Sequence, residues 1–255
     1  MNEQLIFDFN TDLSKIFIPE ELNNPFSHPI PDIARLAATQ FQDYISTKSQ
    51  NWKYDFKVRN GKMFGVLVIQ RNDGSYGFIG TASGVIDRDV VEPHFIPPVF
   101  DSSTDDFFIN KVMTELTEIG TLIKLTHDPV EITEMKELRK QKSLSLQHRL
   151  FEHTRFLNVL GKTKNVLQIF KESSHGNPPS AAGECAAPKL LQYALKNNLR
   201  LIAIAEFWWG NSLKSKEHEH LKFYPACKNK CRPILEYMLN NELLYIQSKK
   251  HENSI

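Results

Sequence analysis

Cysteine is scarce in this sequence, with three residues among 255, and all three lie between positions 183 and 231. Three thiols cannot all pair as disulfides within one chain. In a reducing compartment, clustered thiols are either metal ligands or buried apolar groups. The spacing of Cys185, Cys227 and Cys231 therefore raises two hypotheses, a metal site and a set of buried metal-free thiols.

Long hydrophobic runs are also absent, because no apolar stretch approaches the roughly 20 residues that cross a bilayer. The first residues include Asp8, Asp12, Glu20 and Glu21, without a basic segment ahead of an apolar one, so they do not resemble a secretory signal. No internal repeat or low-complexity tract occurs. We expect a soluble cytoplasmic protein that does not enter a membrane.

The net charge is close to zero, at +1, but it is distributed unevenly. Residues 1–130 contain 11 basic and 18 acidic side chains, a balance of −7. Residues 131–255 contain 20 basic and 12 acidic side chains, a balance of +8. If the protein binds a polyanion, the second half of the chain is expected to contact it.

Hydrophobic periodicity predicts an α/β fold in which a mixed sheet is flanked by helices. Asn72, Asp73 and Gly74 separate two β-rich runs and favour a hairpin turn between them. The prolines within residues 1–35 predict an extended N-terminal arm. The predicted strands are 63–69, 76–86 and 199–209, and the predicted helices of this fold are 33–44, 185–195 and 231–243.

A long antiparallel helical hairpin is predicted as an insertion into this fold. Its first helix begins at Asp105 or Asp106 and is closed by Asp128 and Pro129. Its second helix runs over residues 130–160, where leucines recur at helical spacing. Such a hairpin can form a coiled coil with another helix, which would allow a homodimer or an adaptor for another protein.

The second helix of the hairpin is basic: residues 131–164 contain eight basic and four acidic side chains. This pattern is typical of a surface that faces RNA or a ribosome, and it is equally typical of a solvated helix face. The candidate RNA-contacting residues are Arg139, Lys140, Lys142 and Arg149 in this stretch, together with Lys228, Lys230 and Arg232 near the cysteines.

These patterns divide the chain into three parts. The N-terminal arm, the first helix and the β-hairpin occupy residues 1–104, and the helical hairpin occupies residues 105–172. Residues 173–255 form the C-terminal half of the α/β domain and contain the cysteines. Glycine and proline in residues 175–179 mark the second boundary.

Three strings around the cysteines resemble a known family. They are Gly-Glu-Cys-Ala-Ala-Pro-Lys-Leu-Leu-Gln-Tyr-Ala from Gly183, Ala-Glu-Phe-Trp-Trp-Gly from Ala205, and Phe-Tyr-Pro-Ala-Cys-Lys-Asn-Lys-Cys from Phe223. Together with residues 61–68 and 95–101, they are similar to the N-terminal extension of a subset of RluA-type RNA pseudouridine synthases. The similarity covers most of the chain.

The resemblance implies an accessory role in RNA modification rather than the synthase reaction itself. The catalytic domain of that family carries a His-Arg-Leu-Asp motif whose aspartate attacks the uridine ring. The nearest string in this sequence, His148 to Phe151, ends in phenylalanine instead of aspartate. We therefore expect a module without its own uridine-isomerising aspartate, which binds ribosomal or transfer RNA or an RNA-modifying enzyme.

The cysteines predict a zinc site. Cys227 and Cys231 are four residues apart, so on one helix they share a face, and Cys185 would join them from the start of a neighbouring helix. The order of hairpin, helix, strand and helix also resembles the cytidine-deaminase-like fold, in which a His or Cys and two further Cys bind zinc.

The sequence departs from the deaminase pattern in two places. The glutamate that transfers protons belongs two residues after the first ligand, where this chain has Ala187, and the paired cysteines have three residues between them where two are usual. Glu184 and Glu206 are the candidate catalytic replacements. If one of them acts, the chain is a zinc-dependent nucleobase hydrolase; otherwise a bound zinc ion is structural.

Four further residues near the cysteines have two interpretations each. Trp208 and Trp209 either stack on nucleobases or close the core at the end of a strand. His218 and His220 either supply a fourth zinc ligand or are solvated loop residues.

Overall fold

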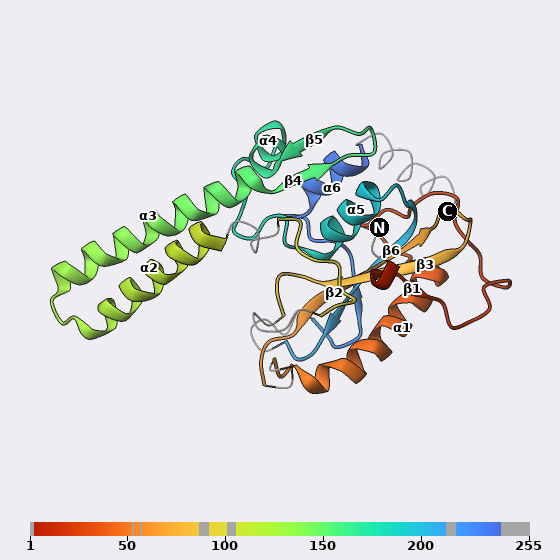
Figure 1. The fold of residues 1–255 in the computed structure, drawn as a ribbon, viewed down its shortest axis with the longest axis horizontal. Coiled ribbons are helices and arrows are strands. Elements are labelled where there is room, and N and C mark those ends of the chain that lie inside the picture. Colours follow the sequence, from red (N-terminus) through yellow and green to blue (C-terminus); the bar gives the residue numbers. More distant parts are fainter. Residues whose placement is uncertain are drawn as a thin grey trace.

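The computed structural model describes residues 3–52, 54–56, 58–86, 92–100, 106–212 and 218–240. Within these residues the chain has a mixed α/β fold with six α-helices, a five-stranded sheet and a separate two-stranded sheet (Figure 1). The strand order of the larger sheet is β1-β3-β2-β6-β7. Its strands are β1 (Phe7–Asp8), β2 (Lys62–Gln70), β3 (Tyr76–Ala82), β6 (Arg200–Trp209) and β7 (Phe223–Tyr224).

All paired strands of this sheet are antiparallel, so the prediction of a mixed sheet was wrong for the described residues. The chain passes from β3 through helices to β6, and both strands run antiparallel to β2. β3 and β6 are therefore parallel to each other, but β2 lies between them and prevents a parallel pair. A single parallel bridge joins Gly80 to Phe95, outside the named strand pairs.

The predicted hairpin between β2 and β3 is confirmed. Its turn is closed by the amide of Arg71, which donates to the carbonyl of Ser75, and Gly74 adopts a φ of 87°. The Asp73 carboxylate accepts hydrogen bonds from the amide and the hydroxyl of Ser75. The sequence predicted this turn from Gly74, which tolerates a left-handed backbone conformation, and from Asp73, whose carboxylate can cap the turn.

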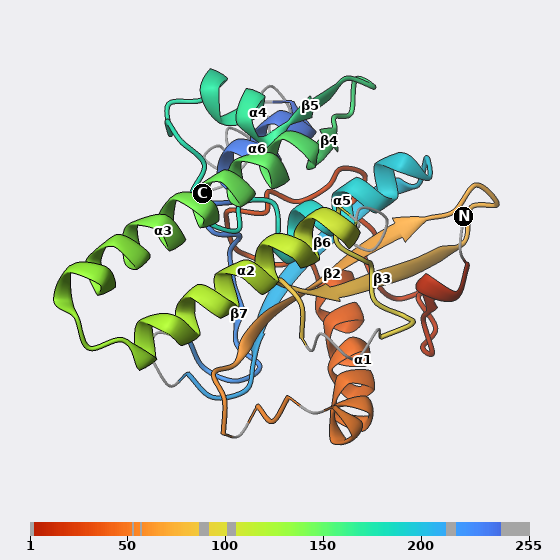
Figure 2. The same cartoon turned by 60° about the vertical axis from the view of Figure 1, so that its left-hand side comes forward.

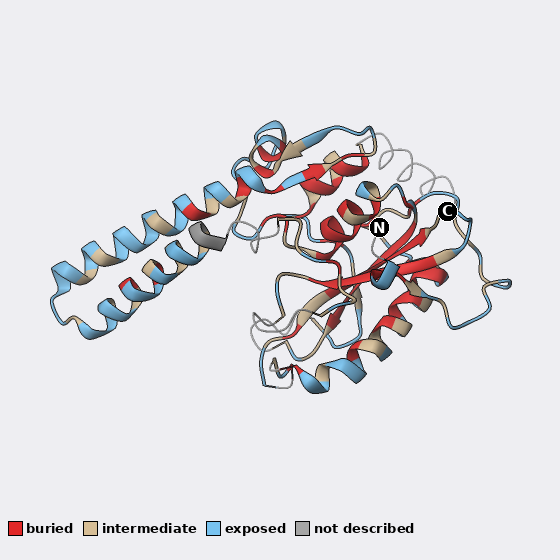
Figure 3. Cartoon of the chain, in the orientation of Figure 1, coloured by how far each residue is buried: buried red, intermediate tan, exposed pale blue. Residues whose placement is uncertain are grey.

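The sheet is covered on both faces by helices, which explains why β2, β3 and β6 are almost continuously buried (Figure 3). Helix α1 (Asp32–Lys48) packs on one face through Ala34, Phe41 and neighbouring apolar residues. Helix α5 (Ala186–Lys196) packs on the other face with α4 (Val166–Glu172) and α6 (Arg232–Leu239). Side chains alternate along a strand, so each central strand contributes to both cores.

Helices α2 (Asp106–Leu125) and α3 (Pro129–His153) lie side by side and extend away from the sheet (Figures 1 and 2). Asp128 caps α3 by accepting a hydrogen bond from the amide of Val130. An ion pair between Lys142 Nζ and Glu115 Oε2, at 2.7 Å, links the two helices. Most of their described surface is exposed to solvent.

Helix α3 ends at His153, although the leucine pattern predicted a helix to residue 160. The chain instead forms β4 (Arg155–Leu157) and β5 (Thr163–Asn165), which pair with each other. The turn between them is held by the Asn158 carboxamide oxygen, which accepts from the amides of Leu160 and Lys162. Because Phe156 is fully buried, its packing outweighs the local helical periodicity.

The N-terminal arm lies along the sheet. Asn23 accepts a hydrogen bond from the amide of Ile204 and donates one to its carbonyl oxygen, so a side chain takes the place of a neighbouring strand. The amide of Ala226 donates to the carbonyl of Pro25. Among the described residues, no helix is both long and apolar enough to span a membrane.

Gly65 on β2 allows α5 to approach the sheet closely. A Cβ atom at this position would lie 2.9 Å from Ala186 Cβ and 3.2 Å from Leu190 Cδ1. The substitution Gly65→Ala is therefore expected to push α5 away and to lower the free energy of unfolding by about 1–3 kcal/mol. Urea denaturation followed by circular dichroism measures this change.

Gly120→Ala on α2 is the matched control, because a Cβ there meets only Arg139 Nε at 3.6 Å. Alanine in an exposed helix is expected to stabilise the protein by up to about 1 kcal/mol. Equal effects of the two substitutions would contradict the close approach of α5 to β2.

Candidate metal centre

The three cysteines converge at one place. Cys185 is the N-cap residue of α5, Cys231 is the N-cap residue of α6, and Cys227 lies in the turn that precedes α6. The Sγ atoms of Cys185 and Cys227 are 3.9 Å apart, and those of Cys227 and Cys231 are 3.0 Å apart. All three sulfurs lie within 4.8 Å of one another, so they can bind one metal ion.

The expected helical placement of the cysteine pair is wrong. Cys227 lies outside α6, because the residues between it and Cys231 form a turn. Pro233 at the start of α6 has no amide hydrogen and fits the first turn of a helix, which places the helix start after the pair. The turn nevertheless brings the two sulfurs together.

The sulfur positions fit a tetrahedral zinc site after a small adjustment. Zinc–sulfur bonds of about 2.3 Å require sulfurs about 3.8 Å apart. The distance between Cys185 and Cys227 meets this value, whereas Cys227 and Cys231 are closer. Cys231 is buried and Cys227 is exposed, so rotation of the Cys227 side chain can open the set.

The electrostatics of the cluster favour a cation. Hydrogen bonding to Cys185, and then to Cys231, lowers the pKa of the Cys227 thiol, and the turn amides of Lys230 and Cys231 add to this effect. Hydrogen bonding with Cys227 raises the pKa of Cys185, and hydrogen bonding with Cys185 raises the pKa of Cys231. The cluster therefore carries one thiolate readily, and ionising the other two thiols requires a positive charge nearby.

Glu206 is a buried carboxylate beside this cluster. It lies on β6, only 6% exposed, and its Oε1 accepts a hydrogen bond of 3.1 Å from the amide of Ala187. Burial raises its pKa to about 7; the Ala187 amide opposes this shift, and the charge of Cys227 adds to it. The Glu206 carboxylate therefore reaches the backbone of Ala187, two residues after Cys185, from the neighbouring strand.

Glu184 is placed differently. Its backbone carbonyl accepts a hydrogen bond from the amide of Gly84, and the residue is half-buried. Burial lowers the pKa of Lys189, and the charge of Glu184 offsets part of this shift. Of the two candidate carboxylates, Glu206 is thus the one that is held in the buried site.

Lys189 was missed by the sequence reasoning. It lies one helical turn after Cys185, is only 2% exposed, and donates a hydrogen bond of 3.2 Å from Nζ to the carbonyl of Gly84. Burial lowers its pKa to about 8, against the attraction of Glu184. The available signal was a lysine inside an otherwise apolar stretch, four residues after a candidate ligand.

The seven candidate RNA-contacting residues lie on three elements: α3, the turn between Cys227 and Cys231, and the start of α6. On α3, Lys142 pairs with Glu115, and Arg139 Nε donates to the carbonyl of Leu116, so both contribute to the packing of α2 against α3. Lys140 pairs with Glu137 at 3.5 Å, while Arg149 lies near the end of α3. Lys228 and Lys230 belong to the turn between the cysteines, and the Arg232 guanidinium lies over the Phe26 ring.

The aromatic and histidine residues are not part of the metal group. His218 stacks on Trp208 with ring centroids 4.5 Å apart, and His220 contacts Trp209 edge-on at 4.7 Å. Among the described residues, the group that can hold a metal contains the three cysteines and neither histidine.

Comparisons of the chain with protein families, with curated proteins and with solved structures find no match. The function of the protein is therefore inferred from the geometry of its site, and the family resemblance stays a prediction.

The buried Glu206 makes stability depend on pH in the metal-free protein. Its pKa is about 7 in the folded state, against an ordinary value of 4.5 for a solvated glutamate, so the folded state retains the proton between these two pH values. The resulting stabilisation is complete below pH 4.5 and is lost as the pH rises through 7. For the chelator-treated protein, we expect a loss on the order of 3 kcal/mol across this range.

Glu206→Gln keeps an acceptor for the Ala187 amide but cannot titrate. Its unfolding free energy, measured in urea, is expected to lack this pH-dependent component. Parallel pH profiles for the two proteins would contradict the burial of a titrating carboxylate at this site.

Proposed function

We propose that the chain is a zinc-binding accessory module of RNA modification, without its own uridine-isomerising aspartate. The convergence of three sulfurs from segments 42 residues apart is the observation that carries the zinc assignment. The resemblance to the N-terminal region of RluA-type pseudouridine synthases carries the link to RNA modification. The order of the β2–β3 hairpin, α5, β6 and α6 supports a scaffold of the cytidine-deaminase type.

Cys185, Cys227 and Cys231 would hold the zinc ion, which supplies a positive charge and Lewis acidity when bound. The positive charge would allow all three thiols to ionise. The bound ion would also link the start of α5 to the start of α6. Because the sulfurs come from two distant segments, the free energy of zinc binding contributes directly to the stability of this part of the fold. An accessory module gains a rigid surface from such a centre.

A zinc-dependent nucleobase hydrolase is the second candidate, and Glu206 is the observation that favours it. Three protein ligands leave one position of a tetrahedral site open, as in catalytic zinc sites. The Glu206 carboxylate, with its pKa raised to about 7, can hold and release a proton near neutral pH. Ammonia release from cytidine, adenosine or guanosine that is lost in Glu206→Gln, with zinc retained, would support this candidate.

A protein-interaction adaptor is the third candidate. Leu122, Leu125 and Val130 surround the turn between α2 and α3 and are 52%, 69% and 66% exposed. Apolar side chains at the end of a projecting pair of helices favour contact with another helix or with a second copy of the chain. In the accessory role, the same surface would contact an RNA-modifying enzyme.

Purified protein is expected to contain one zinc ion per chain. Each of the variants Cys185→Ser, Cys227→Ser and Cys231→Ser should lower zinc affinity at least about tenfold, because each removes one of three thiolate ligands. Competition with a chromophoric chelator measures the affinity.

His220→Ala is the control for this experiment, because His220 contacts Trp209 rather than the sulfurs. Its zinc content should equal that of the natural sequence. The assignment would be contradicted if removing the metal left the thermal stability of the protein unchanged. It would also be contradicted if all three serine variants retained zinc.

RNA binding is expected to depend on the turn between the cysteines. Lys228 and Lys230 form no ion pair with another described residue, whereas Lys142 is paired with Glu115. Replacing Lys228 and Lys230 together by alanine should weaken binding of transfer or ribosomal RNA by about tenfold and reduce its salt dependence. Electrophoretic shifts at two salt concentrations measure both effects.

Lys171→Ala on α4 removes an exposed positive charge from another element and serves as the control. It should bind RNA as the natural sequence does. If no RNA binds even at low salt, the accessory role in RNA contact is wrong. If the protein binds no RNA and light scattering shows a dimer, the adaptor role is favoured instead.

A further inference from the structure

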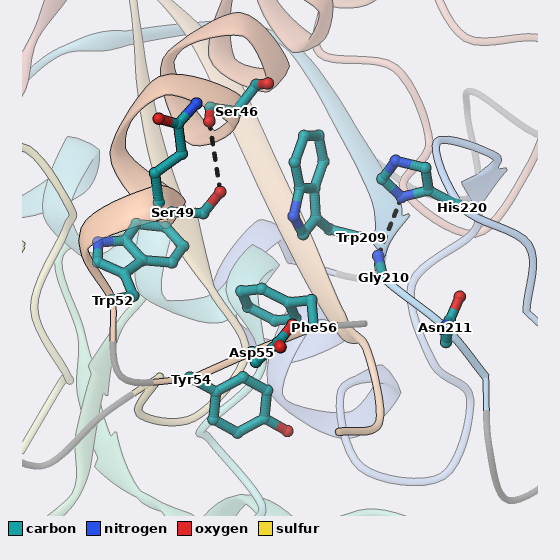
Figure 4. Close-up of a pocket in the computed structure, with 11 residues that line it drawn as sticks. Ser46, Ser49, Trp52, Tyr54, Asp55, Phe56, Trp209, Gly210, Asn211 and His220 are labelled. Atoms are coloured by element: carbon teal, nitrogen blue, oxygen red, sulfur yellow. Dashed lines mark hydrogen bonds between the residues drawn. The ribbon is translucent and has the colours of Figure 1, made fainter. Parts of the chain in front are cut away.

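A cavity of about 620 Å³ lies on the face of the sheet that α1 covers (Figure 4). It is bordered by the end of α1, by the 3-10 turn Ser49–Asn51, by Trp52 and residues 54–56, and by the end of β6. The cysteines belong to the core on the opposite face, with α5 and α6. The cavity is therefore separate from the metal centre, and its volume suits a small organic molecule.

The walls of the cavity are aromatic and fixed. Trp52, Tyr54, Phe56 and Trp209 line it (Figure 4). The indole of Trp52 donates a hydrogen bond of 2.9 Å to Glu92 Oε2, and the hydroxyl of Tyr54 donates one of 2.7 Å to the carbonyl of Asn60. Because the polar ends of both rings are already paired, what remains for a ligand is the apolar surface of the rings.

His220 contacts Trp209 and fixes the position of its ring. The amide of Gly210 donates a hydrogen bond of 3.0 Å to Nδ1 of His220, and the imidazole meets the Trp209 ring edge-on (Figure 4). A ring nitrogen that accepts from an amide carries no proton, so the proton of the neutral imidazole is on Nε2. The cavity thus combines a rigid stacking surface with a hydrogen-bond donor, and Asp55 also lines it.

Two positive charges lie over one of these rings, that of Tyr54. The guanidinium of Arg59 is 5.2 Å from the centroid of the Tyr54 ring, and Nζ of Lys62 is 5.4 Å from it. Neither cation forms an ion pair with a carboxylate of the described part of the chain. An aromatic cage with a carboxylate can also bind a quaternary ammonium ion, but two uncompensated cations at Tyr54 oppose a positively charged ligand.

We propose that this cavity binds a nucleotide, with the base between the aromatic side chains and the phosphate toward Arg59 and Lys62. Any base offers a flat face for stacking, and a phosphate matches the two cations. The ligand is either a free mononucleotide or one unit of a single-stranded RNA. The site does not depend on zinc, because it lies on the other face of the sheet.

Tryptophan fluorescence measures binding to the purified full chain. Uridine, cytidine, adenosine and guanosine 5′-monophosphates and a single-stranded RNA octamer are titrated separately, beside inorganic phosphate, uridine and tetramethylammonium. We expect saturable binding of at least one mononucleotide, tighter than that of uridine or phosphate alone. Tighter binding of the octamer than of every mononucleotide identifies RNA as the source, and the reverse order identifies a free nucleotide.

Three variants locate the ligand. Trp209→Leu and Ser49→Trp, which fills the cavity from its border without removing a ring, should each weaken nucleotide binding about tenfold. Arg59→Ala should weaken nucleotide binding and leave uridine binding unchanged. Lys171→Ala on α4 is the charge control and should have no effect.

Cys227→Ser should also bind nucleotides normally, which separates this proposal from the zinc assignment. The proposal is overturned if no mononucleotide or RNA binds below about 10 mM. It is equally overturned if Ser49→Trp binds as well as the natural sequence, or if tetramethylammonium binds more tightly than every nucleotide.

Discussion

The central strand β6 is buried between two helical layers, and this constraint determines where both candidate sites lie. Consecutive side chains of a strand point to opposite faces of a sheet. Glu206 therefore faces α5 and the cysteines, whereas Trp209, three positions later, faces the α1 side. Displacement of β6 by one residue would exchange the two sets, so the pairing of β6 with β2 fixes the polar site and the aromatic cavity together.

Burial of polar groups at the start of α5 has an electrostatic cost that a metal ion would offset. The three cysteine thiols, the Glu206 carboxylate and the Lys189 amine lie near one another at the start of α5. Of these residues, Cys231, Lys189 and Glu206 are almost fully buried. The amide of Ala187 stabilises Glu206, and the carbonyl of Gly84 stabilises Lys189. The three thiols hydrogen-bond to one another, and the amides of Lys230 and Cys231 also donate to Cys227.

The sequence was informative where a local signal and the fold agree. The turn at Asn72–Gly74 and the convergence of the three cysteines follow from residue type and spacing. The end of α3 was not predictable, because the burial of Phe156 depends on distant residues. The aromatic cavity was also not predictable, because Trp52 and Trp209 are brought together only by the sheet.

X-ray absorption at the zinc edge tests the central claim most directly, because it reports the atoms bound to the metal. The geometry of Cys185, Cys227 and Cys231 predicts three sulfur atoms at about 2.3 Å and one lighter atom. A spectrum with nitrogen and oxygen ligands alone, or one unchanged when all three cysteines are replaced by serine, would contradict it.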